Sequence, residues 1–201
     1  MNRVISNLAL AGGMVLASLC ASTAAFAQAK VFAISSTTFK DGQMLPVKAA
    51  NSKANAPNNA NCVGENVSPQ LSWVNPPDGT KSFVLLMEDP EGRAPAGVHH
   101  MVTYGIAPTV TGFAEGELSK PSDKFVGGKA TQGTGIYNGP CTPPNVQPHH
   151  YTFTLIATDL EPKDLPPGLT REELTAKMVV QGQPLRGKGS AGIVGLFVKP
   201  N

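Results

Sequence analysis

The sequence predicts a mostly β-stranded protein, either a sandwich or a barrel, with little helix. Short β-branched or aromatic runs bounded by turn residues recur along the chain, as all-β domains require: 32–35, 81–89, 99–106, 150–160 and 191–199. Proline (18) and glycine (21) are frequent and scattered, which breaks the chain into short elements. Long stretches with helical periodicity are scarce.

The first 27 residues are predicted to be a signal peptide. A charged "MNR" precedes a long apolar run, and Ala25-Phe26-Ala27 fits the small-x-small rule for cleavage before Gln28. A lipoprotein anchor at Cys20 is the alternative, and the large Leu19 beside it disfavours that anchor. No later apolar run reaches the roughly 20 residues that span a bilayer. We therefore expect a secreted or periplasmic protein without a transmembrane segment, with residues 28–201 forming a single domain.

Charge excludes two classes of partner. Removal of Arg3 with the signal peptide leaves 16 − 1 = 15 basic residues against 14 acidic ones, a net charge of +1. Such a balance gives neither the basic footprint of a nucleic-acid-binding protein nor a polybasic patch for membranes. We expect no nucleic-acid partner.

Two further segments have recognisable local signals. Residues 48–61 include five asparagines and no periodic apolar face, which predicts a mobile surface loop without chemistry of its own.

Thr170 is followed three residues later by Glu173, a capping box, and Leu174 and Met178 stand four apart. This pattern predicts one helix over "REELTAKMVV", residues 171–180.

Two cysteines, Cys62 and Cys141, remain after the predicted cleavage. An even number in an oxidising compartment indicates one disulfide, and two free buried thiols are the alternative.

All four histidines stand in two doublets, His99-His100 and His149-His150. Side chains alternate between the two faces of a strand. His100 is then in phase with Val102, Tyr104 and Ile106, and His149 with Tyr151, Phe153, Leu155 and Ala157. The same alternation places Asp89 in phase with Phe83, Leu85 and Met87. We therefore expect His100, His149 and Asp89 to point inward, and His99 and His150 to point outward.

Three interpretations of these inward groups remain open. They could be unrelated core residues, the two-histidine, one-carboxylate ligand set of a metal, or an anion site with Asp89 orienting one imidazole. The turn "NGPCTPP" precedes His149, and Gly139 can expose backbone N–H groups while the prolines stiffen the wall. Backbone donors beside imidazoles favour an oxyanion.

The chain resembles the phosphatidylethanolamine-binding proteins, also called Raf kinase inhibitor-like proteins, and specifically their exported bacterial branch. Three segments carry this resemblance in the family's order: "CVGENVSPQLSWVNPPDGTKSFVLLMEDPE" (62–91), "GVHHMVTYGI" (97–106) and "GIYNGPCTPPNVQPHHYTFTLIATDL" (135–160). Order and spacing hold from about residue 34 onward.

The resemblance implies a β-sandwich of two antiparallel sheets with a few short peripheral helices. It also implies a small pocket for phosphate-like or carboxylate-like anions. The positions that match the family's ligand-binding residues are Asp89, His100, Gly139, Pro140, His149 and Tyr151. Members of the exported branch pair a cysteine before G-E-N with one in G-P-C, which supports a Cys62–Cys141 disulfide.

The chain departs from the family pattern at the pocket rim. The family's D-P-D-A-P is "DPEGR" here, so that Glu91, Gly92 and Arg93 replace D-A-P, and Val98, His99 and Met101 stand around the strand histidine in place of tryptophans. These changes make the rim less aromatic and add a positive charge at Arg93.

The sequence thus predicts an exported, non-catalytic binding protein for a small anion or phospholipid headgroup, with no cofactor and no metal. One alternative is a protein-interaction or inhibitor module that meets a protein partner through its surface loops, His99 and His150. The other is a metal-dependent hydrolase at the Asp/His/His cluster.

Overall fold

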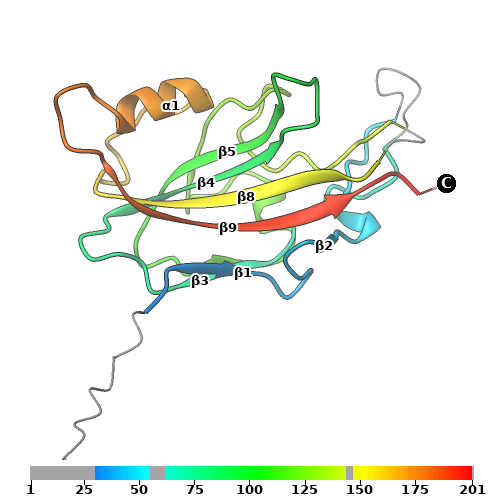
Figure 1. Cartoon of the computed structure of the whole chain (residues 1–201), viewed down its shortest axis with the longest axis horizontal. Coiled ribbons are helices and arrows are strands. Elements are labelled where there is room, and N and C mark those ends of the chain that lie inside the picture. Colours follow the sequence, from blue (N-terminus) through cyan, green and yellow to red (C-terminus); the bar gives the residue numbers. More distant parts are fainter. Residues whose placement is uncertain (1–29, 55–61, 144–146, 201) are drawn as a thin grey trace, which may run out of the picture.

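A computed structural model describes residues 30–54, 62–143 and 147–200 (Figure 1). The predicted signal peptide, residues 1–27, lies outside the described residues, as do residues 55–61 of the asparagine-rich segment. Among the described residues, no helix combines the length and apolarity needed to cross a membrane.

The described strands form two sheets, in agreement with the predicted fold class. The smaller sheet has the order β1-β3-β6, with β1 at Ala33–Ser35, β3 at Leu71–Val74 and β6 at Gly112–Phe113. The larger sheet has the order β2-β9-β8-β4-β5-β7. Its strands are β2 (Gln43–Met44), β4 (Ser82–Asp89), β5 (Val98–Ile106), β7 (Val126–Gly127), β8 (His149–Thr158) and β9 (Gly187–Phe197). Every pairing is antiparallel except the two-residue contact of β2 with β9.

All five predicted strand runs are confirmed, as β1, β4, β5, β8 and β9. The remaining strands were not predicted, because three of them have only two residues and β3 has four. A run of that length carries too little periodicity to be recognised.

The main core lies between the two sheets. Alternate residues of β4 and β8, among them Phe83, Leu85, Phe153 and Leu155, pack against the smaller sheet. Trp73 of β3 meets Phe83 edge-on, with ring centroids 5.5 Å apart. Each fully buried large apolar side chain contributes about 1.5–3 kcal/mol, so this layer is the main source of stability.

A second core covers the opposite face of the larger sheet, under α1 (Arg171–Met178) (Figure 1). Val84 and Leu86 of β4 belong to the same cluster as Leu174 and Met178 of the helix. The predicted capping box is confirmed, since the Thr170 hydroxyl accepts from the Glu173 N–H and the Glu173 carboxylate accepts from the Thr170 N–H. The helix ends two residues before the predicted end at residue 180.

The predicted alternation along β5 is wrong for Val102 and Tyr104, whereas Ile106 faces the main core as expected. The register pairs Met87 with Met101 and Glu88 with His99, which leaves His100 as an inserted residue on β5. Such a β-bulge shifts the following side chains to the other face. Val102 and Tyr104 therefore belong to the cluster under α1, on the opposite side from the ring of Tyr151 that His100 meets.

The asparagine-rich segment does not begin as a surface loop. Val47–Ala49 forms the 3-10 helix η1, and Ala49, Ala50 and Asn51 are buried. A second 3-10 helix, η3, spans Glu117–Ser119.

Candidate ligand-binding site

A cavity of about 480 Å³ lies at one end of the larger sheet. Its position follows from the topology, because β4 runs antiparallel to both β5 and β8. The end of β4 therefore meets the beginnings of β5 and β8, which brings Asp89, His100 and His149 together. The lining residues are Asn51, Lys53, Cys62, Asp89, Glu91, Gly92, Arg93, Val98, His100, Gln132, Asn138, Gly139, Cys141, Thr142, Pro143, His149 and Tyr151. Five of the six predicted ligand-binding residues are among them, and Pro140 is not.

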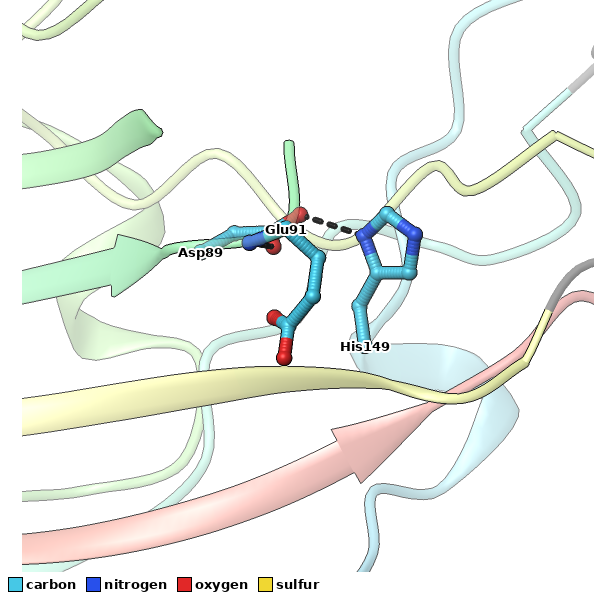
Figure 2. Close-up of side chains that lie close together, drawn as sticks. All are labelled: Asp89, Glu91 and His149. Carbon is cyan, nitrogen blue, oxygen red and sulfur yellow. Dashed lines mark hydrogen bonds and ion pairs between the residues drawn. The ribbon is translucent and has the colours of Figure 1, made fainter. Parts of the chain in front are cut away.

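Asp89 is the anchor of the site and is only 3% exposed. Its Oδ1 accepts hydrogen bonds from the backbone N–H groups of Glu91 (3.0 Å) and Gly92 (2.9 Å). Its Oδ2 accepts from Nδ1 of His149 at 2.8 Å (Figure 2). A buried carboxylate needs such partners, and these three fix its orientation.

The bond to Asp89 fixes the tautomer of His149. A carboxylate accepts, so Nδ1 of His149 must carry the proton. The other nitrogen, Nε2, lies on the far side of the ring from Asp89 and has no partner among the described residues (Figure 2). In the neutral ring Nε2 is an acceptor, and in the imidazolium it is a charged donor.

His100 is held as a neutral imidazole. Its Nδ1 lies 2.7 Å from the carbonyl oxygen of Asn138, which can only accept. Burial lowers the pKa of His100 below its ordinary value, although the Asn138 hydrogen bond and the Asp89 charge act in the other direction. The ring is therefore neutral, with an acceptor at Nε2, 4.0 Å from Oδ2 of Asp89. His100 therefore offers a cavity ligand an acceptor rather than a donor.

Tyr151 forms the apolar wall beneath the two histidines. Its ring meets that of His100 edge-on, with centroids 5.2 Å apart. Burial raises the pKa of the Tyr151 phenol, and the Asp89 charge and hydrogen bonding raise it further. Tyr151 stays protonated at any physiological pH and supplies no negative charge.

The backbone donors expected at residues 139–140 are engaged elsewhere. The N–H of Gly139 donates to Oδ1 of Asn66 at 2.7 Å, and proline has no N–H. The Pro140 carbonyl accepts from the Asn51 N–H at 2.8 Å. Gly139 is needed for close approach instead, because a Cβ there would collide with the backbone carbonyl of Ala49.

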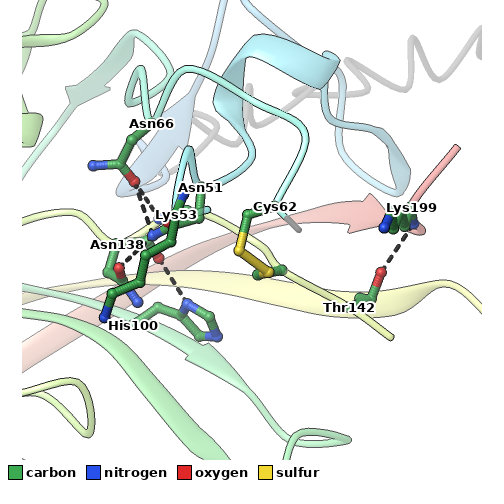
Figure 3. The surroundings of a disulfide bond; sticks show 10 residues. Asn51, Lys53, Cys62, Asn66, His100, Asn138, Thr142 and Lys199 are labelled. Carbon is green, nitrogen blue, oxygen red and sulfur yellow. Dashed lines mark hydrogen bonds between the residues drawn. A yellow bond between two sulfur atoms is a disulfide. The ribbon is translucent and has the colours of Figure 1, made fainter. Parts of the chain in front are cut away.

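The predicted disulfide between Cys62 and Cys141 is confirmed, with the two Cα atoms 5.1 Å apart (Figure 3). Both cysteines line the cavity, so the disulfide is part of its wall.

Asn51 is a cavity residue that the sequence did not reveal. It is buried, and its Nδ2 donates to Oδ1 of Asn138, the residue whose carbonyl holds His100 (Figure 3). Its Oδ1 accepts from the N–H of Lys53 at 2.8 Å. An asparagine at the start of an asparagine-rich run carries no signal that separates it from a loop residue.

One group of side chains has the composition of a metal site. Asp89, Glu91 and His149 each offer a ligand atom within 4.8 Å of the others (Figure 2). Each already has another partner, however. Nδ1 of His149 donates to Asp89, and the Glu91 carboxylate accepts from Nδ1 (2.7 Å) and the N–H (3.1 Å) of His150. These hydrogen bonds leave Nε2 of His149 and the remaining lone pairs of the two carboxylates as the groups that a metal could use.

The two other histidines do not line the cavity, and each pairs with a carboxylate. The ring nitrogens of His99 lie 3.0 Å from Glu88 and 3.2 Å from Glu172 of α1. His150 is half exposed and binds Glu91. Each doublet thus places one ring in the cavity and uses the other to tie neighbouring segments together.

Comparison with known proteins gives consistent matches. A family model described as phosphatidylethanolamine-binding protein matches residues 35–187. A protein of Methanothermobacter thermautotrophicus named UPF0098 is 37% identical over 156 residues, which cover 76% of this chain and 97% of its own. A Mycobacterium tuberculosis protein with a lipoprotein name, LppC, is 32% identical, with 84% of this chain and 73% of its own covered. That lipoprotein name and the disulfide both point to export.

Solved structures match along most of the chain. The crystal structure of Escherichia coli YbcL, described as a new member of the mammalian PEBP family, has a TM-score of 0.70 and 27% identity. It covers 84% of this chain and 99% of its own. Chlamydia trachomatis CT736, described as a homologue of the same family, has a TM-score of 0.67 and 29% identity, with 84% and 98% covered.

Proposed function

The chain belongs to the phosphatidylethanolamine-binding protein family, and we propose that it is an exported, periplasmic or secreted, binding protein for a small oxyanion. The ligand is a phosphate group, free or as part of a phospholipid headgroup. It occupies the cavity between His149 and His100, and the protein catalyses no reaction on it.

The Asp89–His149 pair carries this proposal. Asp89 accepts from Nδ1 of His149 and so leaves Nε2 available to a ligand, and in the imidazolium form Nε2 is a charged donor. Because Asp89 is already bound by two backbone N–H groups and His149, its charge is offset before a ligand arrives. The pair therefore offers an anion a positive donor rather than a bare carboxylate.

His100 adds a requirement on the ligand. Its neutral Nε2 is an acceptor, so it favours a guest that also presents a donor, such as the P–OH of a hydrogen phosphate. A ligand with an acceptor for His149 and a donor for His100 satisfies both rings.

The lining residues support binding rather than catalysis. No serine is among the described residues that line the cavity, and both cysteines there are oxidised. The hydroxyl of Thr142 accepts a hydrogen bond from the Lys199 N–H at 2.9 Å and takes no part in the hydrogen bonds of His100 or His149. An Asp–His pair without a nucleophile beside it lacks the second member of a catalytic dyad.

The pH dependence of binding tests this function. Histidines gain their second proton as the pH falls through about 6.5, whereas His100 resists protonation because it is buried. We expect the affinity for glycerophosphoglycerol, an anionic phosphodiester whose hydroxyls can donate to His100 and whose own charge is constant between pH 8 and 5.5, to rise as the pH is lowered. Calorimetric titration in the presence of a chelator measures this directly. A pH-independent affinity, or binding that disappears with the chelator, would contradict the proposal.

A further inference from the structure

The cavity wall contains two cations that have no counter-ion among the residues that the structure describes. Lys53 and Arg93 both line the cavity, and neither forms an ion pair or a side-chain hydrogen bond with any described residue. The two acidic residues of the wall are different. Asp89 is bound to His149, and Glu91 is bound to His150. The unpaired charge that a ligand meets is therefore positive.

These cations stand on two separate segments, each with a local anchor. Lys53 lies two residues after the buried Asn51 (Figure 3). The backbone N–H of Lys53 donates to Oδ1 of Asn51, and the backbone carbonyl of Lys53 accepts from the N–H of Cys62 at 3.1 Å. Arg93 follows the turn that Asp89 organises through Glu91 and Gly92. Arg93 itself has a φ of 50°, in the left-handed region that few non-glycine residues adopt. The positions of both cations are thus tied to the structure around the two histidines.

We propose that Lys53 and Arg93 form a second anion subsite, which makes the cavity select ligands with two anionic groups over zwitterionic ones. The preferred class is a phosphomonoester that also carries a carboxylate. This inference rests on the proposed phosphate site at His149 and His100 and specifies its ligand.

The charges of the cavity wall do not match those of a zwitterionic ligand. The ammonium group of a phosphoethanolamine needs a free carboxylate or an aromatic face near the phosphate. Here both wall carboxylates have histidine partners, Tyr151 is only 1% exposed, and the two remaining charges repel an ammonium group. A carboxylate in the same position meets two unpaired cations instead.

The test compares 2-phosphoglycolate, phosphoethanolamine and inorganic phosphate as ligands of the mature protein at pH 7 and low salt, by calorimetry. Each partly exposed ion pair changes affinity by about two- to fivefold, so we expect 2-phosphoglycolate to bind about tenfold tighter than phosphoethanolamine. Arg93→Gln and Lys53→Gln should each reduce this preference two- to fivefold. The matched control is Lys163→Gln, which removes an unpaired lysine outside the cavity and should leave the preference unchanged.

The possible outcomes distinguish a failure of the second anion subsite from a failure of the proposed phosphate site. If inorganic phosphate binds but the two organic ligands bind equally, or if neither variant changes their ratio, the second subsite is wrong and the phosphate site stands. If none of the three ligands binds, the phosphate site is wrong and the inference falls with it.

Discussion

Replacing Asp89 with alanine is expected to lower the free energy of unfolding by about 3–5 kcal/mol, the cost of breaking a buried ion pair, and to abolish phosphate binding. The substitution leaves the N–H groups of Glu91 and Gly92 without an acceptor and removes the group that orients His149. The loss should appear as a lower midpoint of denaturant unfolding and as the absence of binding heat.

The matched control for this change is Asp123→Ala, since Asp123 is exposed and has no ion pair among the described residues. A surface change of this kind should alter stability by no more than about 0.5 kcal/mol. If Asp89→Ala folds poorly, Asp89→Asn keeps the shape of the side chain and tests binding alone. Stability and affinity equal to those of Asp123→Ala would contradict the role given to Asp89.

Removing the disulfide is expected to cost about 2–4 kcal/mol of stability and to weaken phosphate binding. The double variant Cys62→Ser, Cys141→Ser opens a covalent loop with a sequence separation of 79 residues, so the unfolded chain gains conformational freedom. Both cysteines line the cavity, and the segment after Cys62 includes Asn66, which holds the N–H of Gly139.

Denaturant unfolding and phosphate titration of the double variant measure the two effects. Each can be compared with the wild-type protein before and after treatment with a reductant. An unfolding midpoint equal to that of the oxidised wild type would contradict the stabilising role of the disulfide. Unchanged affinity would show that the disulfide does not support the cavity wall.

The meeting of Asp89 and His149 was predictable because β4 and β8 follow the simple alternation of a strand. Phe153, Leu155 and Ala157 of β8 all face the main core. Because every second residue of a regular strand lies on the same face, His149 was assigned to the correct face. The same counting failed along β5, where the inserted His100 changes which face Val102 and Tyr104 occupy. A bulge depends on the register with a neighbouring strand, which the sequence of one strand does not contain.

Two errors at the site have a common physical origin. The N–H of Gly139 was expected to face a ligand, and Asn51 was expected to lie in a loop without chemistry. In the structure these two segments lie against each other, with Gly139 bound to Asn66 and Asn51 bound to Asn138. Such contacts between irregular segments have no sequence period. The family resemblance pointed to Gly139, which lines the cavity, and to Pro140, which does not, and it could not show which hydrogen-bonding groups of this segment are already used.

The arrangement of the strand ends also explains why histidine occurs only in doublets. Glu88, Asp89 and Glu91 stand at the end of β4, and the histidines at the beginnings of β5 and β8 face them. One histidine of each pair turns into the cavity. The other pairs with a carboxylate, His99 with Glu88 and His150 with Glu91.

Calorimetric titration of inorganic phosphate into wild-type protein, His149→Gln and His150→Gln tests the central claim most directly. The two variants carry the same substitution on adjacent residues of β8, and glutamine can still donate to Asp89 or Glu91 but cannot become a cation. We predict saturable binding to the wild type, an affinity within about threefold of it for His150→Gln, and a loss of at least about tenfold, or 1.4 kcal/mol, for His149→Gln. Equal affinities for the two variants would contradict an anion site built on the Asp89–His149 pair.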